Sequence, residues 1–371
     1  MKKLLYIVDY LHNEPNSVSS ILNSILRLDI RNTEKIVVQH QGNQDGTFTI
    51  GTIDRIKTYT AKKNSTYLKL FKRVQGKLFG YKDSKLCNEE HIKRIIEIEK
   101  PNLVFFFLYS PEKEYARICE AKGIPYVYML YDTYIGRPEL ECDTQSVIAN
   151  ELEVIEKSIN YFVPSFFYNE YQLFYNSQKI IPYDLPLLVD IHSVKQGYDS
   201  QSSNCDFTYF GQVQSFRNAD KIKSIFKSLN IQLDIFTQTN IESDEVFRIH
   251  QPVNGADLNK TVAHSKFLIA FDNSSPYEQY LPSKAYLYVS FTKPIIAFGD
   301  NDDSALIQFF RDYPLFYYQN IHRTTDGLVR FINEQYSFGF NENVYHRYLR
   351  YLPENALVNV QRVIEETMNN R

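Results

Sequence analysis

The sequence predicts an α/β protein of two consecutive domains, each a doubly wound parallel sheet covered by helices on both faces. The chain has 371 residues, and at roughly 100 to 200 residues per domain that length favours two domains. Short, continuously apolar runs, typical of buried parallel strands, alternate with segments of helical periodicity. The alternation stops at the polar segment His192–Asn204, which we interpret as a linker, and then starts again. Two sheets of similar size are therefore expected.

In the first predicted domain, residues 1–190, apolar strands alternate with amphipathic helices. It opens with the apolar run Lys3–Asp9, and Ser17–Leu28 then places its apolar residues at helical spacing. The later strands are Lys35–Gln39, Asn102–Leu108, Pro125–Leu130 and Tyr161–Val163, and the later helices are His91–Glu99, Glu112–Lys122 and Thr144–Ser158.

The second predicted domain, residues 191–340, opens with the strand Asp206–Phe210, which Gly211 closes. Its further strands are Gln232–Phe236, Phe267–Phe271 and Pro294–Phe298, and its helices are Ala219–Leu229, Leu258–Ser265, Lys284–Ser290 and Ser304–Phe310. The tail, residues 341–371, has helical patterning and no strand of its own. We expect it to pack back onto what precedes it.

Charge and cysteine content exclude several classes of function. Lys and Arg number 41 against 44 Asp and Glu, a balance that gives no sign of a nucleic-acid partner. The four cysteines form no CxxC pair, so neither a zinc site nor a disulfide framework is indicated. The first apolar run ends at Asp9, too short for a signal peptide or a membrane span. A cytoplasmic location is expected.

The most specific motif lies between Tyr277 and Ala297. Pro282-Ser283-Lys284 opens a predicted helix, and Lys293-Pro294-Ile295-Ile296 opens the strand after it. In this segment the sequence resembles the nucleotide-sugar domain of GT-B fold glycosyltransferases of the family 4-like group (glycosyl transferases group 1). Further segments agree in the right order: Lys122–Asp132, Tyr161–Ser165 and Asp206–Gly211. The resemblance spans most of the chain and implies two Rossmann-like domains that face each other across a cleft.

A donor site follows partly from the residues and partly from the resemblance. Gly211 stands between a strand and a helix, where backbone N–H groups can hold a phosphate with Arg217 and Lys221 adding charge, although a lone Gly can equally make a tight turn. The resemblance implies that Lys284 faces the diphosphate, as Arg217 would through its two-pronged guanidinium. Ser283 either bonds a phosphate oxygen or caps its helix.

Three positions depart from the family pattern. The glutamate that usually holds the nucleotide ribose falls on Leu287, which cannot accept a hydrogen bond, and a usual glycine falls on Thr292. The family pairs this glutamate with a second one upstream, and the position of that second glutamate falls on Gln279, directly after Glu278. Either Glu278 binds the ribose from a shifted register, or the donor is held differently.

Catalytic candidates lie in the first domain. Asp132, just beyond the strand Pro125–Leu130, could deprotonate an acceptor hydroxyl or hold a sugar, and an Asx turn or helix cap is the alternative. The family's first-domain histidine has no clear equivalent, because Leu108-Tyr109-Ser110 occupies that strand end. His12, after the first strand, is the second candidate, and a solvated loop histidine is its alternative.

Asp300–Asp303 contains an Asp-x-Asp, a pattern that holds a divalent cation in the other large glycosyltransferase class. It directly precedes the helix at Ser304, where acidic residues are favoured by capping and by the helix dipole. We therefore expect no metal and no cofactor, with the nucleotide-sugar as a substrate.

Between Arg55 and Lys85, ten basic residues stand against Asp83 alone. Aromatic and aliphatic side chains recur there at helical spacing, as on a helix that binds an anionic membrane surface. The alternative is a surface helix that packs on the first domain. The basic residues on the polar side, proposed to contact the membrane, are Lys69, Lys72, Arg73 and Lys77.

The expected function is a hexosyltransferase-type glycosyltransferase, metal-independent and peripheral on the inner face of the cell membrane if the basic segment binds lipid. It would move a sugar from a nucleotide-sugar, with UDP favoured, to a hydroxyl of a lipid-linked glycan in bacterial-type surface polysaccharide synthesis. Leu287 and Thr292 motivate an alternative, a catalytically silent GT-B partner or glycan-binding protein. A nucleotide-sugar epimerase shares the architecture. No G-x-G-x-x-G occurs, which argues against a dehydrogenase.

Overall fold

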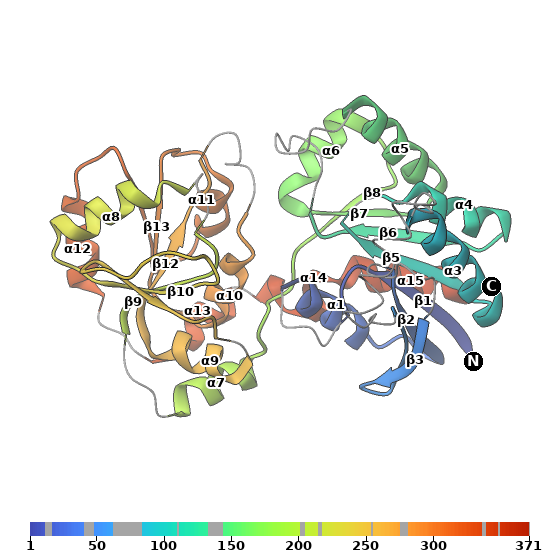
Figure 1. Cartoon of the computed structure of the whole chain (residues 1–371), viewed down its shortest axis with the longest axis horizontal. Coiled ribbons are helices and arrows are strands. Elements are labelled where there is room, and N and C mark those ends of the chain that lie inside the picture. Colours follow the sequence, from blue (N-terminus) through green and yellow to red (C-terminus); the bar gives the residue numbers. More distant parts are fainter. Residues whose placement is uncertain are drawn as a thin grey trace, which may run out of the picture. The chain divides into compact units, whose positions relative to one another are not determined.

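The computed structural model of the chain describes two compact units (Figure 1). Unit 1 comprises Met1–Asp184 and Ala356–Arg371, and unit 2 comprises Leu185–Asn355. The division at Leu185 lies near the expected one at residue 191, and it shares the tail 341–371 between the two units. The described residues are 1–11, 17–40, 48–61, 84–109, 111–132, 144–200, 205–213, 217–253, 255–274, 281–335, 339–347 and 349–370.

Unit 1 is built on an eight-stranded sheet of order β3-β4-β2-β1-β5-β6-β7-β8. Its neighbouring strands are parallel, except that β3 and β4 form an antiparallel hairpin at one edge. The strands are β1 (Lys2–Val8), β2 (Thr33–Gln39), β3 (Phe48–Ile53), β4 (Ile56–Ala61), β5 (Leu103–Leu108), β6 (Tyr126–Leu130), β7 (Tyr161–Pro164) and β8 (Ile180–Tyr183). The central strands β1, β5 and β6 are almost wholly buried, because helices cover both faces of the sheet.

The helices in the described part of unit 1 are α1 (Ser17–Arg27), α3 (Ser84–Glu99), α4 (Lys113–Ala121), α5 (Thr144–Lys157), the short 3₁₀ turn η1 (Ser165–Phe167), α6 (Tyr168–Tyr175) and α15 (Val358–Asn369). The last of these, α15, returns to unit 1 and contacts β5 and β8. Its buried side chains include Val360 and Ile364, and Gln361 donates a hydrogen bond to the carbonyl of Asp29 at 3.2 Å. The chain end thus packs back, as expected from its lack of a strand.

Unit 2 is built on a six-stranded sheet of order β11-β10-β9-β12-β13-β14, with every neighbouring pair parallel. The strands are β9 (Cys205–Phe210), β10 (Leu233–Phe236), β11 (Phe247–His250), β12 (Ser265–Phe271), β13 (Ile295–Gly299) and β14 (Phe316–Asn320). The helices are α7 (Ile191–Asp199), α8 (Ala219–Ser228), α9 (Gly255–His264), α10 (Lys284–Ser290), α11 (Ala305–Phe310), α12 (Asp326–Glu334), α13 (Glu342–Arg347), the 3₁₀ turn η3 (Leu349–Tyr351) and α14 (Pro353–Ala356).

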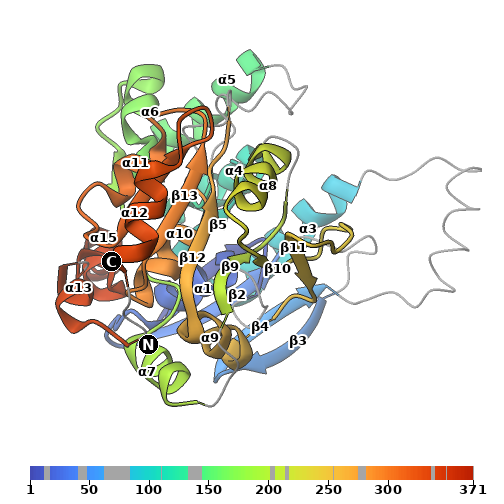
Figure 2. The ribbon, with the colours of Figure 1, turned by 90° about the vertical axis from the view of Figure 1, so that its left-hand side faces the viewer.

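Helices cover both faces of the unit 2 sheet, as Figures 1 and 2 show. Ile222 of α8 and Leu328 of α12 belong to the core cluster on one face. On the other face, α9 and α10 contact β12, and the hydroxyl of Tyr288 in α10 lies 3.2 Å from the backbone nitrogen of Phe210. This double coverage explains the continuously apolar strands of the sequence.

The interpretation of His192–Asn204 as a linker is wrong over most of its length. Ile191–Asp199 is the helix α7, and the Asp190 side chain caps it by accepting a hydrogen bond from the Ser193 backbone N–H at 3.0 Å. The helix packs on α9. It buries only Val194 and Gly197, so its apolar periodicity is too weak to be recognised in the sequence.

The strands that the sequence did not predict lie at or next to the sheet edges. They are β3, β4, β8, β11 and β14. An edge strand has fewer buried side chains, as in β14, where Gln319 is the buried residue, and β8 contains Pro182, which edge strands tolerate. Continuous hydrophobicity therefore identifies the sheet centres but not their edges.

Candidate functional site

In unit 2, the polar residues of interest follow the carboxyl ends of neighbouring strands. Gly211 follows β9, Asp272 and Asn273 follow β12, and Asp300 follows β13. Because these strands are parallel and adjacent, all four residues lie at one edge of the sheet. Open parallel sheets bind their ligands at this carboxyl edge.

Gly211 and Lys284, predicted from different segments, are in direct contact. Gly211 has a φ of 123°, and a Cβ placed on it would overlap the Cε and Nζ atoms of Lys284. The Lys284 side chain therefore lies across the backbone at the end of β9, and its ammonium is 5.6 Å from the centroid of the Tyr209 ring. Only glycine allows this approach.

The charge of Lys284 is held in an unfavourable setting. The side chain is half-buried, and burial together with the nearby Arg217 lowers its pKa to about 7. Among the described residues no carboxylate pairs with it. A bound anion would relieve both the desolvation and the repulsion between the two cations.

Arg217 is oriented by neutral acceptors. Its Nε donates to Asn273 Oδ1 at 3.1 Å, and its Nη1 donates to the Tyr209 hydroxyl at 2.8 Å and to the Gln212 carbonyl at 3.1 Å. These three bonds fix the plane of the guanidinium. Arg217 and Lys284 thus form a cationic pair beside Gly211, which we call the cation pair.

The other predicted donor residues lie around or outside this pair. Ser283 precedes α10, and its hydroxyl makes no capping hydrogen bond with that helix, so the capping alternative is wrong. Lys221 is exposed in the first turn of α8 and has no hydrogen bond or ion pair with any described residue. Glu278 lies outside the described residues.

The two described departures from the family pattern, Leu287 and Thr292, have structural roles here. Leu287 is buried in α10 with 7% of its surface exposed. Thr292 has a φ of 53°, in the left-handed region that favours glycine, and its Oγ1 accepts a hydrogen bond from the Asn341 backbone N–H at 2.8 Å. Leu287 therefore offers no hydrogen-bond acceptor at the position of the ribose glutamate.

Sequence reasoning missed Asp272 and Asn273. Asn273 positions Arg217, and burial raises the pKa of the neighbouring Asp272 carboxyl to about 6. Their signal was available, because both directly follow the predicted strand Phe267–Phe271.

Unit 1 has a different constellation at its carboxyl edge. Asp9 follows β1, His40 follows β2, Tyr109 follows β5, and Tyr131 and Asp132 follow β6. His40 Nε2 lies 2.5 Å from Asp9 Oδ1. The Tyr109 backbone N–H and the Tyr131 hydroxyl donate to Asp9 Oδ2 at 2.6 and 2.8 Å. We call Asp9, His40, Tyr109 and Tyr131 the Asp9 hub.

Asp132, the predicted base, is half-buried directly after Tyr131. The pKa of the Tyr131 hydroxyl is raised far above its usual value, mainly by burial. The nearby carboxylates of Asp9 and Asp132 raise it further. His12 lies outside the described residues. Sequence reasoning missed Asp9 and His40, although each directly follows or ends a predicted strand.

The Asp-x-Asp segment is engaged in local contacts. Asn218 Nδ2 donates to Asp300 at 3.0 Å, Asp302 pairs with Arg323, and Ser304 caps α11. Within the part of the chain that the structure describes, no group of three or more His, Cys, Asp and Glu side chains could hold a metal ion.

The predicted membrane residues Lys69, Lys72, Arg73 and Lys77 lie outside the described residues. In the described part of the basic segment, Lys57 belongs to β4 and forms an ion pair with the buried Glu99 at 2.5 Å. No described helix combines the length and the apolar character needed to cross a membrane.

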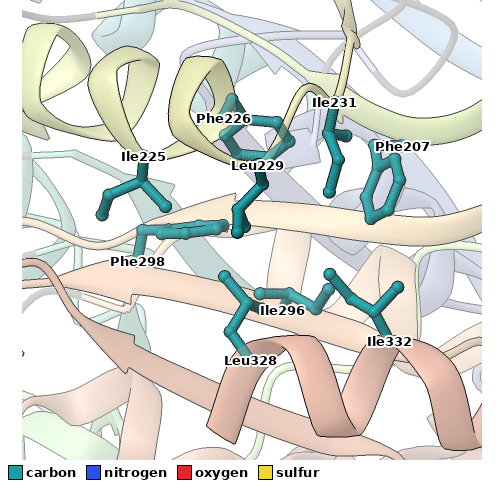
Figure 3. Close-up of a pocket in the computed structure, with 9 residues that line it drawn as sticks. All are labelled: Phe207, Ile225, Phe226, Leu229, Ile231, Ile296, Phe298, Leu328 and Ile332. Atoms are coloured by element: carbon teal, nitrogen blue, oxygen red, sulfur yellow. The ribbon is translucent and has the colours of Figure 1, made fainter. Parts of the chain in front are cut away.

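Unit 2 also contains a small apolar cavity (Figure 3). Figure 3 shows Ile225 and Phe226 of α8 opposite Leu328 and Ile332 of α12. With a volume of about 10 Å³ and no polar lining, it is a packing defect of the core rather than a ligand site. The remaining lining residues are Phe207, Leu229, Ile231, Ile296 and Phe298.

Comparison with known proteins identifies the fold. No family model matches the sequence, and no curated protein sequence matches it. Solved structures do match over the whole chain. The chain is similar to a sucrose-phosphate synthase from Thermosynechococcus elongatus, with a TM-score of 0.68, 7% identity and 100% of both chains covered.

Two further structures agree. A glycosyltransferase from Rickettsia africae has a TM-score of 0.68 and 12% identity over 100% of this chain and 99% of the other. The HepE protein of Anabaena, solved in complex with UDP, has a TM-score of 0.60 and 10% identity over 100% of both chains. The predicted GT-B fold is thereby confirmed.

Proposed function

We propose that the protein is a glycosyltransferase that uses a nucleotide-sugar donor, with UDP-sugars favoured. The observation that carries the proposal is the cation pair: Lys284 and Arg217 converge beside Gly211 at the carboxyl edge of a parallel sheet. A diphosphate would supply negative charge to Lys284, which has no carboxylate partner among the described residues, and the guanidinium of Arg217 beside it can bind two phosphate oxygens. The UDP bound by the structurally similar HepE supports the same choice of ligand.

In this proposal, unit 2 stabilises the leaving group. As the bond between sugar and diphosphate breaks, negative charge accumulates on the phosphate oxygens, and the ammonium of Lys284 and the fixed guanidinium of Arg217 offset it. Asp132 of unit 1 accepts the proton from the acceptor hydroxyl as that oxygen attacks the sugar. No metal ion is assigned a role.

The deciding experiment is a donor screen by thermal shift with UDP-, GDP-, dTDP- and CMP-sugars, since a ligand that binds only the folded protein raises its apparent stability. Lys284→Met should weaken binding of the active nucleotide by roughly 1.5 to 3 kcal/mol. Lys260→Ala, which removes an exposed lysine of α9, is the matched control and should leave binding unchanged. Equal binding by both variants would remove the cation pair from the donor site.

We further propose a lipid-linked glycan as the acceptor, in surface polysaccharide synthesis at the inner face of the cell membrane. The basic segment between Arg55 and Lys85 supports this. Sedimentation with anionic and with neutral liposomes tests it. Replacing Lys69, Lys72, Arg73 and Lys77 together by Gln should abolish a salt-sensitive preference for the anionic vesicles, and binding that is unaffected would contradict the proposal.

Leu287 favours a second candidate, a catalytically silent binding protein, because this buried leucine stands where the family has its ribose carboxylate. Isothermal titration with nucleoside diphosphates separates the two functions: a transferase binds at least one of them, and the silent protein binds none at millimolar concentration. The epimerase alternative is separated by its product, since it would convert a nucleotide-sugar with no acceptor present.

A further inference from the structure

The carboxyl edge of unit 1 carries partly exposed aromatic rings that the proposed chemistry does not use. Tyr109 and Tyr131 follow the adjacent strands β5 and β6, and their ring centroids lie 6.0 Å apart with the planes inclined by 35°. Both side chains are half-buried. Tyr10, at the end of the neighbouring β1, is 39% exposed. Most other tyrosines of this unit are buried in its core.

These rings are held in fixed positions. The Tyr131 hydroxyl donates to Asp9 Oδ2 at 2.8 Å, and its ring packs at 5.2 Å from the fully buried ring of Phe107. The backbone N–H of Tyr109 donates to the same Asp9 oxygen at 2.6 Å. Asp9 is itself buried and held by His40. One carboxylate therefore anchors the backbone of Tyr109 and the side chain of Tyr131 before any ligand arrives.

The charges beside the rings select the kind of ligand. The carboxylates of Asp9 and Asp132 both act on the Tyr131 hydroxyl, so a phosphate at this place would meet like charge. A sugar ring is neutral, and its C–H face can pack on an aromatic face while its hydroxyls donate to a carboxylate such as Asp132. A nucleotide fits this edge less well than it fits the cation pair of unit 2.

We propose that Tyr109 and Tyr131 form the subsite that binds a sugar ring of the acceptor, and that Asp9 is a positioning residue for both. This inference rests on the proposed transferase function and names its acceptor class, a pyranoside. The ring of Tyr109 contacts the sugar directly. The ring of Tyr131 is held in place by the hydrogen bond from its hydroxyl to Asp9. The carboxylate of Asp132 accepts a hydrogen bond from a hydroxyl of the bound sugar.

Saturation-transfer NMR on the full chain tests the subsite with defined probes. The probes are the methyl pyranosides of glucose, galactose and N-acetylglucosamine, with uridine as a competing ring and UDP as the donor probe. At least one pyranoside should receive saturation at its ring C–H protons. Tyr109→Ala should weaken its binding by roughly three- to tenfold. Phe174→Ala, which removes an exposed ring of α6, is the matched control and should leave it unchanged.

Tyr131→Phe separates positioning from packing, because it keeps the ring and removes only the bond to Asp9. Pyranoside binding should weaken by about two- to threefold, a smaller loss than that caused by Tyr109→Ala. Far-UV circular dichroism establishes that each variant is folded. An equal affinity in wild type and Tyr109→Ala would overturn the inference, as would uridine displacing the pyranoside from these residues.

The same spectra distinguish the two proposals. If UDP binds but no pyranoside does at high millimolar concentration, the subsite is wrong and the donor site stands. If a pyranoside binds through Tyr109 while UDP and other nucleoside diphosphates do not bind, the transferase function is wrong and unit 1 is a carbohydrate-binding unit.

Discussion

The two sheets present opposite electrostatic situations at their carboxyl edges. In unit 1, Asp9 is buried and both of its oxygens are occupied, by His40 on one side and by Tyr109 and Tyr131 on the other. In unit 2, Lys284 lies beside Arg217 with no carboxylate partner among the described residues, and its pKa is lowered to about 7. The polar groups of Asp9 are satisfied within the protein, whereas in our proposal Lys284 gains its counter-charge from a bound anion.

This contrast separates stability from binding. A satisfied buried group contributes to folding, and its loss leaves several partners unpaired. A desolvated cation without a counter-charge lowers the stability of the folded state, and that cost is recovered when the ligand binds. Residues of the Asp9 hub and of the cation pair should therefore respond in opposite ways to substitution.

The largest effect is expected at the hub. Asp9→Ala removes the acceptor for Tyr109 and Tyr131 and leaves the buried Nε2 of His40 without its carboxylate partner, so the free energy of unfolding should fall by about 3 to 5 kcal/mol. Urea unfolding measures this loss. Lys284→Met, the parallel change in unit 2, should be neutral or should stabilise by up to about 2 kcal/mol. A similar destabilisation by both variants would remove the contrast.

Raising the pH should move stability and donor affinity in opposite directions through Lys284. Its folded pKa is about 7 and its ordinary value is 10.5. Between these values the unfolded chain holds a proton here that the folded protein has released, so stability from this group rises with pH across that window. Anion binding requires the ammonium charge, so nucleotide affinity should fall above pH 7 by up to about tenfold per pH unit.

Titration calorimetry with UDP at pH 7, 8 and 9 measures this dependence, starting where the terminal phosphate is already ionised. The variant Lys284→Met should show a flat profile over the same range. A wild-type profile that is equally flat would mean that the lysine does not contact the diphosphate.

The effect of Gly211 should be intermediate. Gly211→Ala places a methyl group where the Lys284 side chain lies. It also requires a backbone φ of 123°, which residues with a side chain rarely adopt. Donor affinity and stability should each fall by roughly 1 to 3 kcal/mol. Gly255→Ala is the matched control in the same unit, because Gly255 also has a positive φ, 55°, but would meet no atom within 4 Å. Gly255→Ala should lower stability and leave donor affinity unchanged.

The same comparison shows what the sequence could predict. The proposed donor residues could be selected from the sequence because Lys284 belongs to a local motif and Gly211 ends a clear apolar strand. Asp9 and His40 could be located at strand ends, but their contacts could not be predicted, because they join distant segments. Asp9 meets His40 only through the parallel pairing of β1 with β2, and meets Tyr131 only through the order β1-β5-β6. Short-range patterns contain no information on which strands become neighbours.

The interior of the fold was predictable for a related reason. Strands buried on both faces are apolar throughout, and β1, β5 and β6 are visible as runs of hydrophobic residues. The helix α7 and the edge strands bury too few side chains to show a period, so they become evident only when the sheet is assembled. Asn273 could be located after a predicted strand, but its hydrogen bond to Arg217 depends on the pairing of β9 with β12.

The smallest effect is expected at Lys221. This residue tests whether a positive charge near the proposed site is enough to strengthen nucleotide binding. Proximity in sequence to Gly211 and Arg217 led to its prediction as a donor residue, but the side chain is exposed in α8 and contacts none of the described residues of the cation pair. Water and salt screen such a charge, so Lys221→Ala should change nucleotide affinity by less than about 0.5 kcal/mol. Titration of UDP at low and at physiological salt checks this. A loss as large as that of Lys284→Met would show that the bound diphosphate extends to the first turn of α8, and the donor site would have to be redrawn around that helix.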